Sequence, residues 1–292
     1  MQDIYYSALE KRAILLISGA DKRTFLQSLI SNDMMRVSEN RSIFAAFLSP
    51  QGKYQYDFFI SQTKSGFFID CERDRLKNLS ERLSIFKLRA DVSFLDYSDT
   101  FRVFSIWGPS ALRQLELPAS PGHSEDSPLG RVMVDPRLVS AGIRVITKSD
   151  HLSLPGALLV GSKDYDLHRL NLGLTDGCRD LIIDKSILLE ANFDELNGVD
   201  WNKGCYLGQE VTARSRYRGL IKKRFIPVKI SEGQAKTGDI IFSEDKKIGQ
   251  IRSISGELAM AIINIEYLKA DSSPYLSNDC KLLPIIPDWI KL

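Results

Sequence analysis

This chain of 292 residues contains few of the side chains that build disulfide frameworks or metal sites. Its four cysteines, at positions 71, 178, 205 and 280, form no CxxC pair and have no histidine at ligand spacing. The three histidines are scattered as well. We therefore expect neither a disulfide framework nor a metal site, and no histidine-centred catalytic triad is indicated.

Long apolar runs and the common nucleotide motifs are missing too. No apolar run approaches the roughly 18 residues of a membrane span, and the N-terminus does not resemble a secretory signal or a transit peptide. These absences predict a cytoplasmic protein with no membrane partner. The chain also lacks GxGxxG, GxSxG, HExxH and P-loop motifs, so the usual dinucleotide, hydrolase and metalloprotease sites are not expected.

The composition is typical of a globular protein. Hydrophobic residues make up 43% and charged residues 26% of the chain, and the formal net charge is +2. So small a net charge gives no overall attraction to nucleic acid or to a membrane, and any anion site has to be local. A length of 292 residues suggests two or three domains.

Short strands, hairpins and helices alternate irregularly in the first part of the chain. Residues 43–48 and 54–60 have the pattern of two strands joined by a tight turn at Ser49-Pro50-Gln51-Gly52. Asp21 is a typical N-cap for a helix. The Pro- and Ser-rich residues 118–130 are typical of an exposed loop. This order of elements predicts an α+β fold.

The pattern changes beyond Gly219. Short strands at regular spacing follow, separated by turn residues, at 224–230, 239–242, 248–254 and 257–263. Such a series is typical of a small β-barrel or sandwich. We therefore predict an α+β region over residues 1–219 and a C-terminal β-barrel domain over residues 220–292.

The run from Lys203 to Arg214 has the most unusual composition in the chain. Gly204 and Gly208 permit backbone angles, and a close approach to a bound molecule, that other residues do not. We interpret the run as a binding loop that leads into a helix. The alternative is a glycine-rich turn that only caps a helix.

Side chains of several chemical kinds are gathered in this run. Tyr206 can stack on a flat heterocycle, and Gln209 and Glu210 can bond to an edge that carries donors and acceptors. Lys203 and Arg214 can neutralise an anion.

Cys205 lies near Lys203 and just before the expected helix, a setting that favours the thiolate form of a cysteine. Two interpretations remain open for it. It is either a reactive thiol, which would act as a nucleophile, a redox group or a soft-metal ligand, or a small residue that is present only because it fits.

The same run resembles the signature of the folate-binding YgfZ family. The similar residues are Lys203-Gly204-Cys205-Tyr206-Leu207-Gly208-Gln209-Glu210, continued by 212–214 and 217–219. Weaker similarities cover nearly the whole chain: residues 19–33 resemble the opening of the family, 50–57 its first hairpin and 190–203 its approach to the signature.

The resemblance implies two interleaved α+β subdomains that form a folate pocket, followed by a C-terminal barrel, as in the glycine cleavage T-protein superfamily. It implies tetrahydrofolate or a one-carbon derivative as the cofactor. It also implies a role in iron-sulfur cluster assembly or repair, with cluster assembly proteins or client enzymes as partners.

A comparison with the T-protein, an aminomethyltransferase, singles out two further residues. Asn171 stands where the T-protein carries a glutamate for the pterin, and an amide cannot offer the two anionic acceptors of a carboxylate. This difference argues against methyl transfer and makes Glu210 a candidate for the missing charge. Asp57 is the candidate for the catalytic aspartate of the T-protein.

These residues suggest one arrangement. A reduced folate would stack on Tyr206, with Glu210 or Gln209 on the pterin edge and Arg214 on the glutamate tail. Further basic residues would form a cationic mouth, or else only a solvated basic face: Arg216, Arg218, Lys222, Lys223 and Arg224. Cys205 would attack or release a one-carbon unit, or touch a cluster in a role that is transient or shared with a partner, because clusters usually take four thiolates.

Two rival functions belong to other classes. One is a folate-dependent aminomethyltransferase that turns over methylene-tetrahydrofolate. The other is a tRNA-modification accessory protein that would bind nucleic acid through the basic residues after Arg214.

Overall fold

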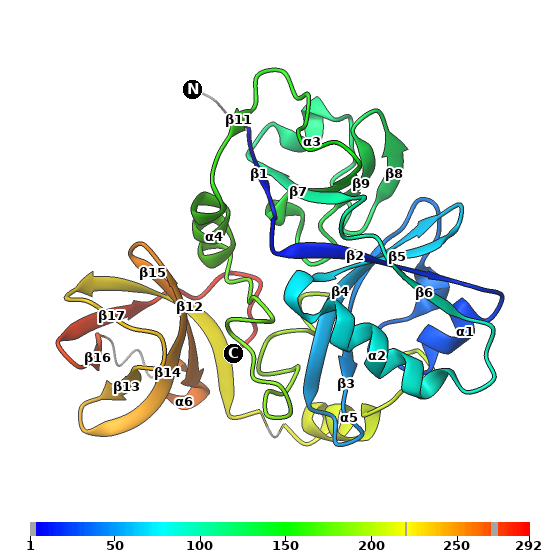
Figure 1. Cartoon of the computed structure of the whole chain (residues 1–292). Coiled ribbons are helices and arrows are strands. Elements are labelled where there is room, and N and C mark those ends of the chain that lie inside the picture. Colours follow the sequence, from blue (N-terminus) through cyan, green and yellow to red (C-terminus); the bar gives the residue numbers. More distant parts are fainter. Residues whose placement is uncertain (1–3, 220, 270–273) are drawn as a thin grey trace. The chain divides into compact units, whose positions relative to one another are not determined.

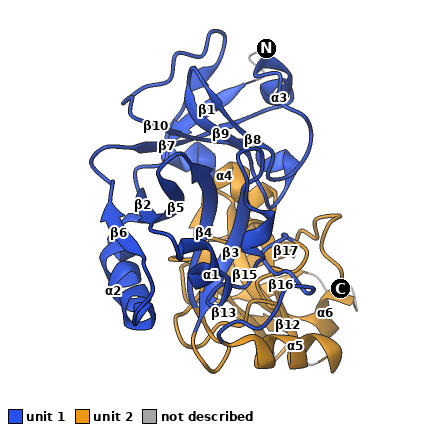
Figure 2. Ribbon diagram, turned by 90° about the vertical axis from the view of Figure 1, so that its right-hand side faces the viewer, with its two compact units in different colours: residues 1–48, 55–165, 196–207 blue, residues 49–54, 166–195, 208–292 orange. Residues whose placement is uncertain are grey.

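The computed structural model describes residues 4–219, 221–269 and 274–292 (Figure 1). The strands form a five-stranded sheet, a six-stranded sheet and a closed barrel. This architecture confirms the α+β class and the C-terminal β-barrel. The chain divides into two compact units, one of residues 1–48, 55–165 and 196–207 and the other of residues 49–54, 166–195 and 208–292 (Figure 2).

The five-stranded sheet lies in the first unit. Its strand order is β3 (Ile43–Leu48), β4 (Tyr54–Thr63), β5 (Gly66–Glu72), β2 (Arg12–Ser18) and β6 (Ser93–Asp96). Two helices, α1 (Lys22–Gln27) and α2 (Leu76–Lys87), bury Leu26 and Leu79 in the same hydrophobic core. The sequence suggested that the Asp21 side chain caps α1, but it does not. Its carboxylate instead accepts a hydrogen bond from the Asp91 amide at 2.8 Å.

The six-stranded sheet also belongs to the first unit. Its order is β11 (Leu158–Leu159), β1 (Tyr5–Ala8), β7 (Arg102–Trp107), β10 (Ile143–Thr147), β9 (Gly130–Val134) and β8 (Ser124–Ser127). Strand β1 precedes the whole five-stranded sheet in sequence, and the chain returns to the six-stranded sheet at β7. The two sheets are therefore interleaved along the chain, as expected.

Strand β8 corrects one expectation. Residues 118–130 were expected to be an exposed loop, yet β8 pairs with β9 and the Ser124 side chain is buried. The segment is polar in sequence, and only its pairing with β9 makes it a strand.

A buried carboxylate joins the two sheets. Asp70 of β5 accepts hydrogen bonds from Arg144 of β10 at 2.6 and 2.9 Å and from the Nε of Arg12 of β2 at 2.7 Å. Burial alone would raise the pKa of Asp70, but the two guanidinium groups outweigh it and hold that pKa below its usual value. The buried charge of Asp70 is thus compensated from both sheets.

The barrel lies in the second unit. Its order is β12 (Lys223–Glu232), β15 (Leu258–Asn264), β14 (Lys246–Ser255), β13 (Ile240–Ser243), β16 (Tyr275–Ser277) and β17 (Cys280–Pro284), with the short helix α6 (Ile265–Lys269) after β15. Apolar residues at alternate positions, such as Ile226 and Val228, fill its interior. The expected domain boundary falls at Leu220, which lies outside the described residues, and stays a prediction.

Two more helices and two short helical turns complete the elements that bear on the site. Helix α4 (Ser162–Asn171) precedes a long stretch of turns, and helix α5 (Gln209–Tyr217) follows it. In the first unit, the turn η1 (Met34–Arg36) follows α1, and η2 (Arg73–Arg75) precedes α2. In the described part of the chain, no helix has the length and apolar character that crossing a membrane requires.

Candidate functional site

Lys203 fastens the loop that carries Cys205 to the first unit. Its ammonium donates hydrogen bonds to the carbonyl oxygens of Gln27 at 2.9 Å, Ile30 at 2.5 Å and Asn32 at 2.8 Å. These carbonyls lie at the C-terminal end of α1 and just beyond it. Because an ammonium has three N–H groups, the three bonds use all of its donors. The structure therefore gives Lys203 a structural role in addition to the folate contact expected of it, which stays a prediction.

The environment of Lys203 and the packing of Tyr206 and Leu207 fix the rest of the loop. Burial lowers the pKa of the Lys203 ammonium to about 8, although Asp33 and Asp200 act in the opposite direction. The Lys203 ammonium lies 4.9 Å from the ring centroid of Tyr206, a cation–π distance. Leu207 packs against the core of the five-stranded sheet, and its amide donates to the Ser28 carbonyl at 3.0 Å. The loop is therefore anchored at both ends.

Cys205 lies between these anchors with its side chain exposed. Cys71 and Cys280 are buried, and burial raises the pKa of both thiols. Cys178 and Cys205 are exposed, and none of the four cysteines forms a disulfide. Within residues 4–219, 221–269 and 274–292, no group of three or more His, Cys, Asp or Glu side chains is placed to hold a metal ion. Cys205 is therefore an accessible thiol in a fastened loop, and the described residues form no metal cage around it.

The loop turns into helix α5 at Gly208, as the sequence predicted. Gly208 has a φ of 80°, a left-handed conformation that favours glycine, and α5 begins at the next residue. The two compact units are joined through the backbone at this point, since Leu207 belongs to the first and Gly208 to the second.

The turn between β3 and β4 packs against the start of α5 within the second unit. A Cβ atom at Gly52 would lie 2.7 Å from the Cβ of Val211 and 2.8 Å from the carbonyl oxygen of Gly208. Gly52 is therefore required by this contact as well as by its φ of 69°. Two segments that the sequence singled out separately are thus held together.

The candidate contacts to the pterin edge and the folate tail lie on α5. Gln209 is half-buried at the first position of the helix. Glu210 and Arg214 form an ion pair one turn apart, with side chains 82% and 51% exposed. An exposed pair of this kind stabilises a helix by only about 0.3–0.5 kcal/mol, so either charge can be given up to a ligand at little cost.

The two residues singled out by the T-protein comparison lie in different units. Asp57 is on β4 in the first unit, where it is buried and contributes to the negative charge around Arg12. Asn171 is the last residue of α4 in the second unit and is exposed. The roles expected of both residues stay predictions.

The proposed cationic mouth requires one correction. Arg224 is buried, and its guanidinium donates to Glu195 at 2.8 and 3.1 Å and to the Leu189 carbonyl at 2.7 Å. It therefore cannot belong to an exposed basic surface. The exposed basic residues of this stretch are Arg214, Arg216, Arg218, Lys222 and Lys223.

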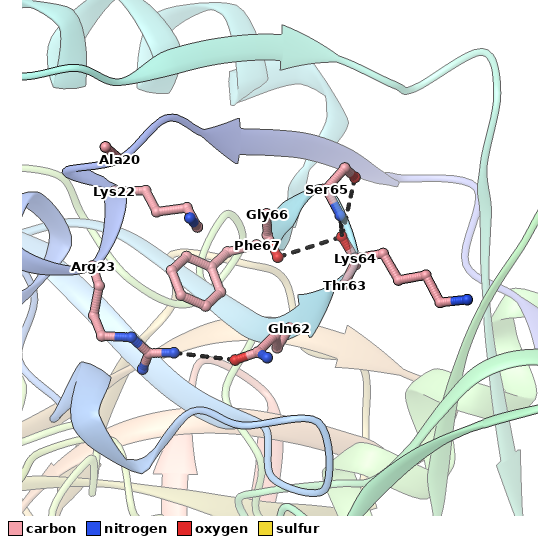
Figure 3. A pocket seen from close by; sticks show the side chains of 9 residues that line it. All are labelled: Ala20, Lys22, Arg23, Gln62, Thr63, Lys64, Ser65, Gly66 and Phe67. Carbon is pink, nitrogen blue, oxygen red and sulfur yellow. Dashed lines mark hydrogen bonds between the residues drawn. The ribbon is translucent and has the colours of Figure 1, made fainter.

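A cavity in the first unit was not expected from the sequence. It has a volume of about 450 Å³ and lies between the start of α1 and the turn that joins β4 to β5 (Figure 3). The Arg23 guanidinium lies 4.9 Å from the Phe67 ring centroid and donates to Gln62 at 3.0 Å, whereas the Lys64 side chain points away from the ring (Figure 3). No single motif indicates such a cavity, because its walls come from segments about 40 residues apart in sequence.

Comparison with known proteins shows which family the chain resembles. The chain is 28% identical over 312 residues to the mitochondrial iron-sulfur cluster assembly factor IBA57 of Mus musculus, an alignment that covers 96% of this chain and 84% of the relative. The human IBA57 is also 28% identical, over 309 residues and with the same coverage. The C-terminal beta-barrel domain of CAF17 matches residues 222–292. The chain is therefore similar to the IBA57/CAF17 family over nearly its whole length. This similarity confirms the resemblance to YgfZ-like proteins.

More distant similarity, to a solved structure, defines the fold of this chain. The aminomethyltransferase T of the glycine cleavage system from Bartonella henselae superposes with a TM-score of 0.78. The superposition covers 99% of this chain and 86% of the other, at 13% identity. The fold is therefore that of the T-protein, as expected, and at this identity the similarity concerns the fold alone.

Proposed function

We propose that this protein is an iron-sulfur cluster assembly or repair factor that binds a reduced folate and uses Cys205 as its reactive thiol. The observation that carries the proposal is similarity to the assembly factor IBA57 over 96% of the chain. The exposure of Cys205, in a loop fastened by Lys203, supports the choice of the thiol.

The thiol would act together with a partner. A cluster usually takes four thiolates, and one exposed cysteine cannot supply them. The described residues hold no group of three or more potential ligands. Contact between Cys205 and a cluster would therefore be transient, or the partner protein would supply the remaining ligands. Components of the assembly machinery or client enzymes are the partners that fit this chemistry.

The folate would lie along the run from Tyr206 to Arg214. Tyr206 offers a half-buried ring for stacking, and Gln209 and Glu210 offer acceptors to the N–H groups of the pterin edge. Arg214 would exchange its exposed bond to Glu210 for a carboxylate of the glutamate tail. The bound folate would supply a one-carbon unit or serve as a regulatory or reducing partner. The cytoplasmic location expected from the sequence stays a prediction.

Two measurements test the proposal. In cells that lack their own copy, the chain should restore the activity of enzymes that contain [4Fe–4S] clusters. In solution, reduced folate should bind saturably, as followed by tryptophan fluorescence through the neighbouring Trp201. Glu210→Ala should weaken this binding about tenfold, because it removes a charged acceptor.

Glu232→Ala is the matched control, since Glu232 is another exposed carboxylate in an ion pair, with Lys281 at 2.8 Å. It should leave the folate affinity unchanged. Failure to restore cluster enzymes would contradict the assembly role. Equal affinities in the wild type and Glu210→Ala would contradict the role assigned to Glu210.

The fold similarity to an aminomethyltransferase gives the rival function a direct test. An aminomethyltransferase would turn over methylene-tetrahydrofolate with an amine donor and lose that activity in Asp57→Asn. We expect binding of reduced folate without such turnover. The tRNA-related alternative predicts RNA affinity that falls steeply with salt and weakens on charge reversal at Lys222 and Lys223.

A further inference from the structure

A second cavity lies within the first unit and is lined by two arginines. Its volume is about 240 Å³, and Arg36 and Arg41 line it together with Ser42, Asn32 and Asn197. None of the described residues that line it is acidic. The cavity is smaller than the roughly 300–1,000 Å³ that is usual for small-molecule sites, so it suits a compact ligand.

The two arginines leave a positive charge in the cavity. Arg36 pairs with Asp200 at 3.1 Å, whereas the described residues provide no carboxylate partner for Arg41. Burial and the nearby charge of Arg36 lower the pKa of Arg41. Two guanidinium groups and one carboxylate give the cluster a net charge of about +1 by this count, and an anion would relieve the repulsion between the arginines.

Ser42 provides an independent observation. Its side chain is only 1% exposed, and its hydroxyl has no hydrogen-bond partner. A buried hydroxyl without a partner is costly, and Ser42 is one of the residues that line the cavity, so a ligand oxygen that reaches the hydroxyl would satisfy it. The Ser42 backbone is held in place, because its amide donates to the Gly122 carbonyl at 2.7 Å.

The asparagine amides stiffen the wall of the cavity. Asn32 Nδ2 donates to the carbonyl oxygens of Phe44 and Asn197, both at 2.7 Å, and Asn197 Nδ2 donates to the Pro136 carbonyl at 3.1 Å. These bonds join three segments that are distant in sequence. The site is therefore fixed by internal hydrogen bonds before a ligand arrives.

We propose that this cavity binds a phosphoryl group, as inorganic phosphate or a small phosphate monoester. Two planar guanidinium groups and a hydroxyl on the lining of one cavity provide several donors, which suits the three free oxygens of a phosphate monoester. A carboxylate has only two oxygens and a single charge, and one arginine would satisfy it. The proposal does not depend on folate binding or on a role in cluster assembly.

The phosphoryl site would be linked to the Cys205 loop through Asp200. One carboxylate oxygen of Asp200 pairs with Arg36, and the other accepts hydrogen bonds from the amides of Asn202 at 2.8 Å and Lys203 at 3.2 Å. A ligand that binds Arg36 therefore competes directly with a group that shapes the start of that loop.

Isothermal titration of the full chain in Tris chloride buffer tests the proposal. Inorganic phosphate and glycerol 3-phosphate should bind saturably at one site, and acetate at least about tenfold more weakly. Arg41→Gln should weaken phosphate binding about tenfold or more, and Ser42→Ala should weaken it several-fold. The ratio of the two phosphate affinities distinguishes a site for the free ion from a site for a monoester.

Lys64→Gln is the matched control, because it removes one exposed positive charge from the wall of the other cavity. It should leave phosphate binding unchanged. The proposal is overturned if phosphate does not saturate, if acetate binds as tightly, if Arg41→Gln binds like the wild type, or if Lys64→Gln weakens binding as much as Arg41→Gln does. Arg41 is exposed and Ser42→Ala removes only an unbonded hydroxyl, so both variants should fold, which circular dichroism checks.

Discussion

Gly52 lies against Val211 so closely that a Cβ atom on the glycine would come within 2.7 Å of the valine Cβ. This contact packs the turn between β3 and β4 against the first turn of α5. The turn and the helix are about 160 residues apart in sequence, and both belong to the second unit. The orientation of Gln209 and Glu210 at the start of α5 therefore depends on a glycine far away in the chain.

Gly52→Ala should destabilise the protein and reduce its support of cluster enzymes. The alanine would meet both the steric contact with Val211 and a φ of 69°, and each such strain costs about 1–3 kcal/mol. Gly156→Ala separates the two effects, because Gly156 has a φ of 77° but no atom within 4 Å of the added Cβ. Chemical denaturation should show a larger loss of unfolding free energy for Gly52→Ala than for Gly156→Ala. Equal losses in the two variants would show that the contact with Val211 is unimportant.

Lys203→Met should lower the free energy of unfolding by about 1.5–3 kcal/mol or more, because three carbonyl oxygens would lose a charged donor. The substitution should also loosen the loop itself, in addition to lowering the stability of the whole protein. Hydrogen exchange at the Leu207 amide, which bonds to the Ser28 carbonyl, should become faster than in the wild type. Lys64→Met, at an exposed lysine, is the control and should change neither quantity. Unchanged exchange at Leu207 in Lys203→Met would argue against the anchoring role.

Asp70→Asn should destabilise the protein by about 3–5 kcal/mol, because it removes the carboxylate that pairs with the buried Arg144 and leaves Arg12 with its pair to Glu72. The surface pair Arg102–Asp150 offers the comparison, since its side chains are 39% and 69% exposed. Asp150→Asn should cost no more than about 1 kcal/mol. Because its pKa is lowered on folding, Asp70 stabilises the protein above pH 3.8 and loses this contribution as the pH falls through the folded value. Similar losses in the two variants would refute the importance assigned to the Asp70 cluster.

Glu195 should make the stability depend on pH in the opposite direction. Burial and the neighbouring Asp194 raise the pKa of Glu195 from 4.5 to about 7, although Arg224 lowers it. A raised pKa means that the folded state binds the proton more tightly, so this group's contribution to stability falls as the pH rises from 4.5 to about 7. Asp194→Asn should reduce that fall, which denaturation at pH 4.5 and pH 8 would detect. An identical fall in the variant would mean that Asp194 does not set the pKa of Glu195.

The sequence predicted the elements that carry a strong local pattern. The limits expected for β3, residues 43–48, agree with the structure, because this strand is a continuous buried run. Strand β8 was missed since its residues, Ser124–Ser127, are all polar and become a strand only by pairing with β9. A local pattern also failed to predict the role of Asp21, because its carboxylate accepts a hydrogen bond from the amide of Asp91, 70 residues later in the chain.

In the candidate site, too, the sequence predicted the features that have a local pattern and missed those that depend on long-range contacts. Glycines and a polar run predicted a loop that leads into a helix, and α5 begins within this run, at Gln209. The carbonyl partners of Lys203 lie about 170 residues earlier in the chain, so no local pattern indicates them. The burial of Arg224 was missed for the same reason, because Glu195 compensates it only in the folded chain. Both cavities depend on contacts of this long-range kind.

The most direct test of the account compares Cys205→Ser with Cys178→Ser, the same replacement at the other exposed cysteine. Each full-length variant would be expressed in cells that lack their own copy, and the activity of a [4Fe–4S] enzyme would be measured against equal amounts of folded protein. We predict that Cys178→Ser restores the activity fully and that Cys205→Ser restores little or none. Full restoration by Cys205→Ser would contradict the central claim that this thiol takes part in cluster assembly.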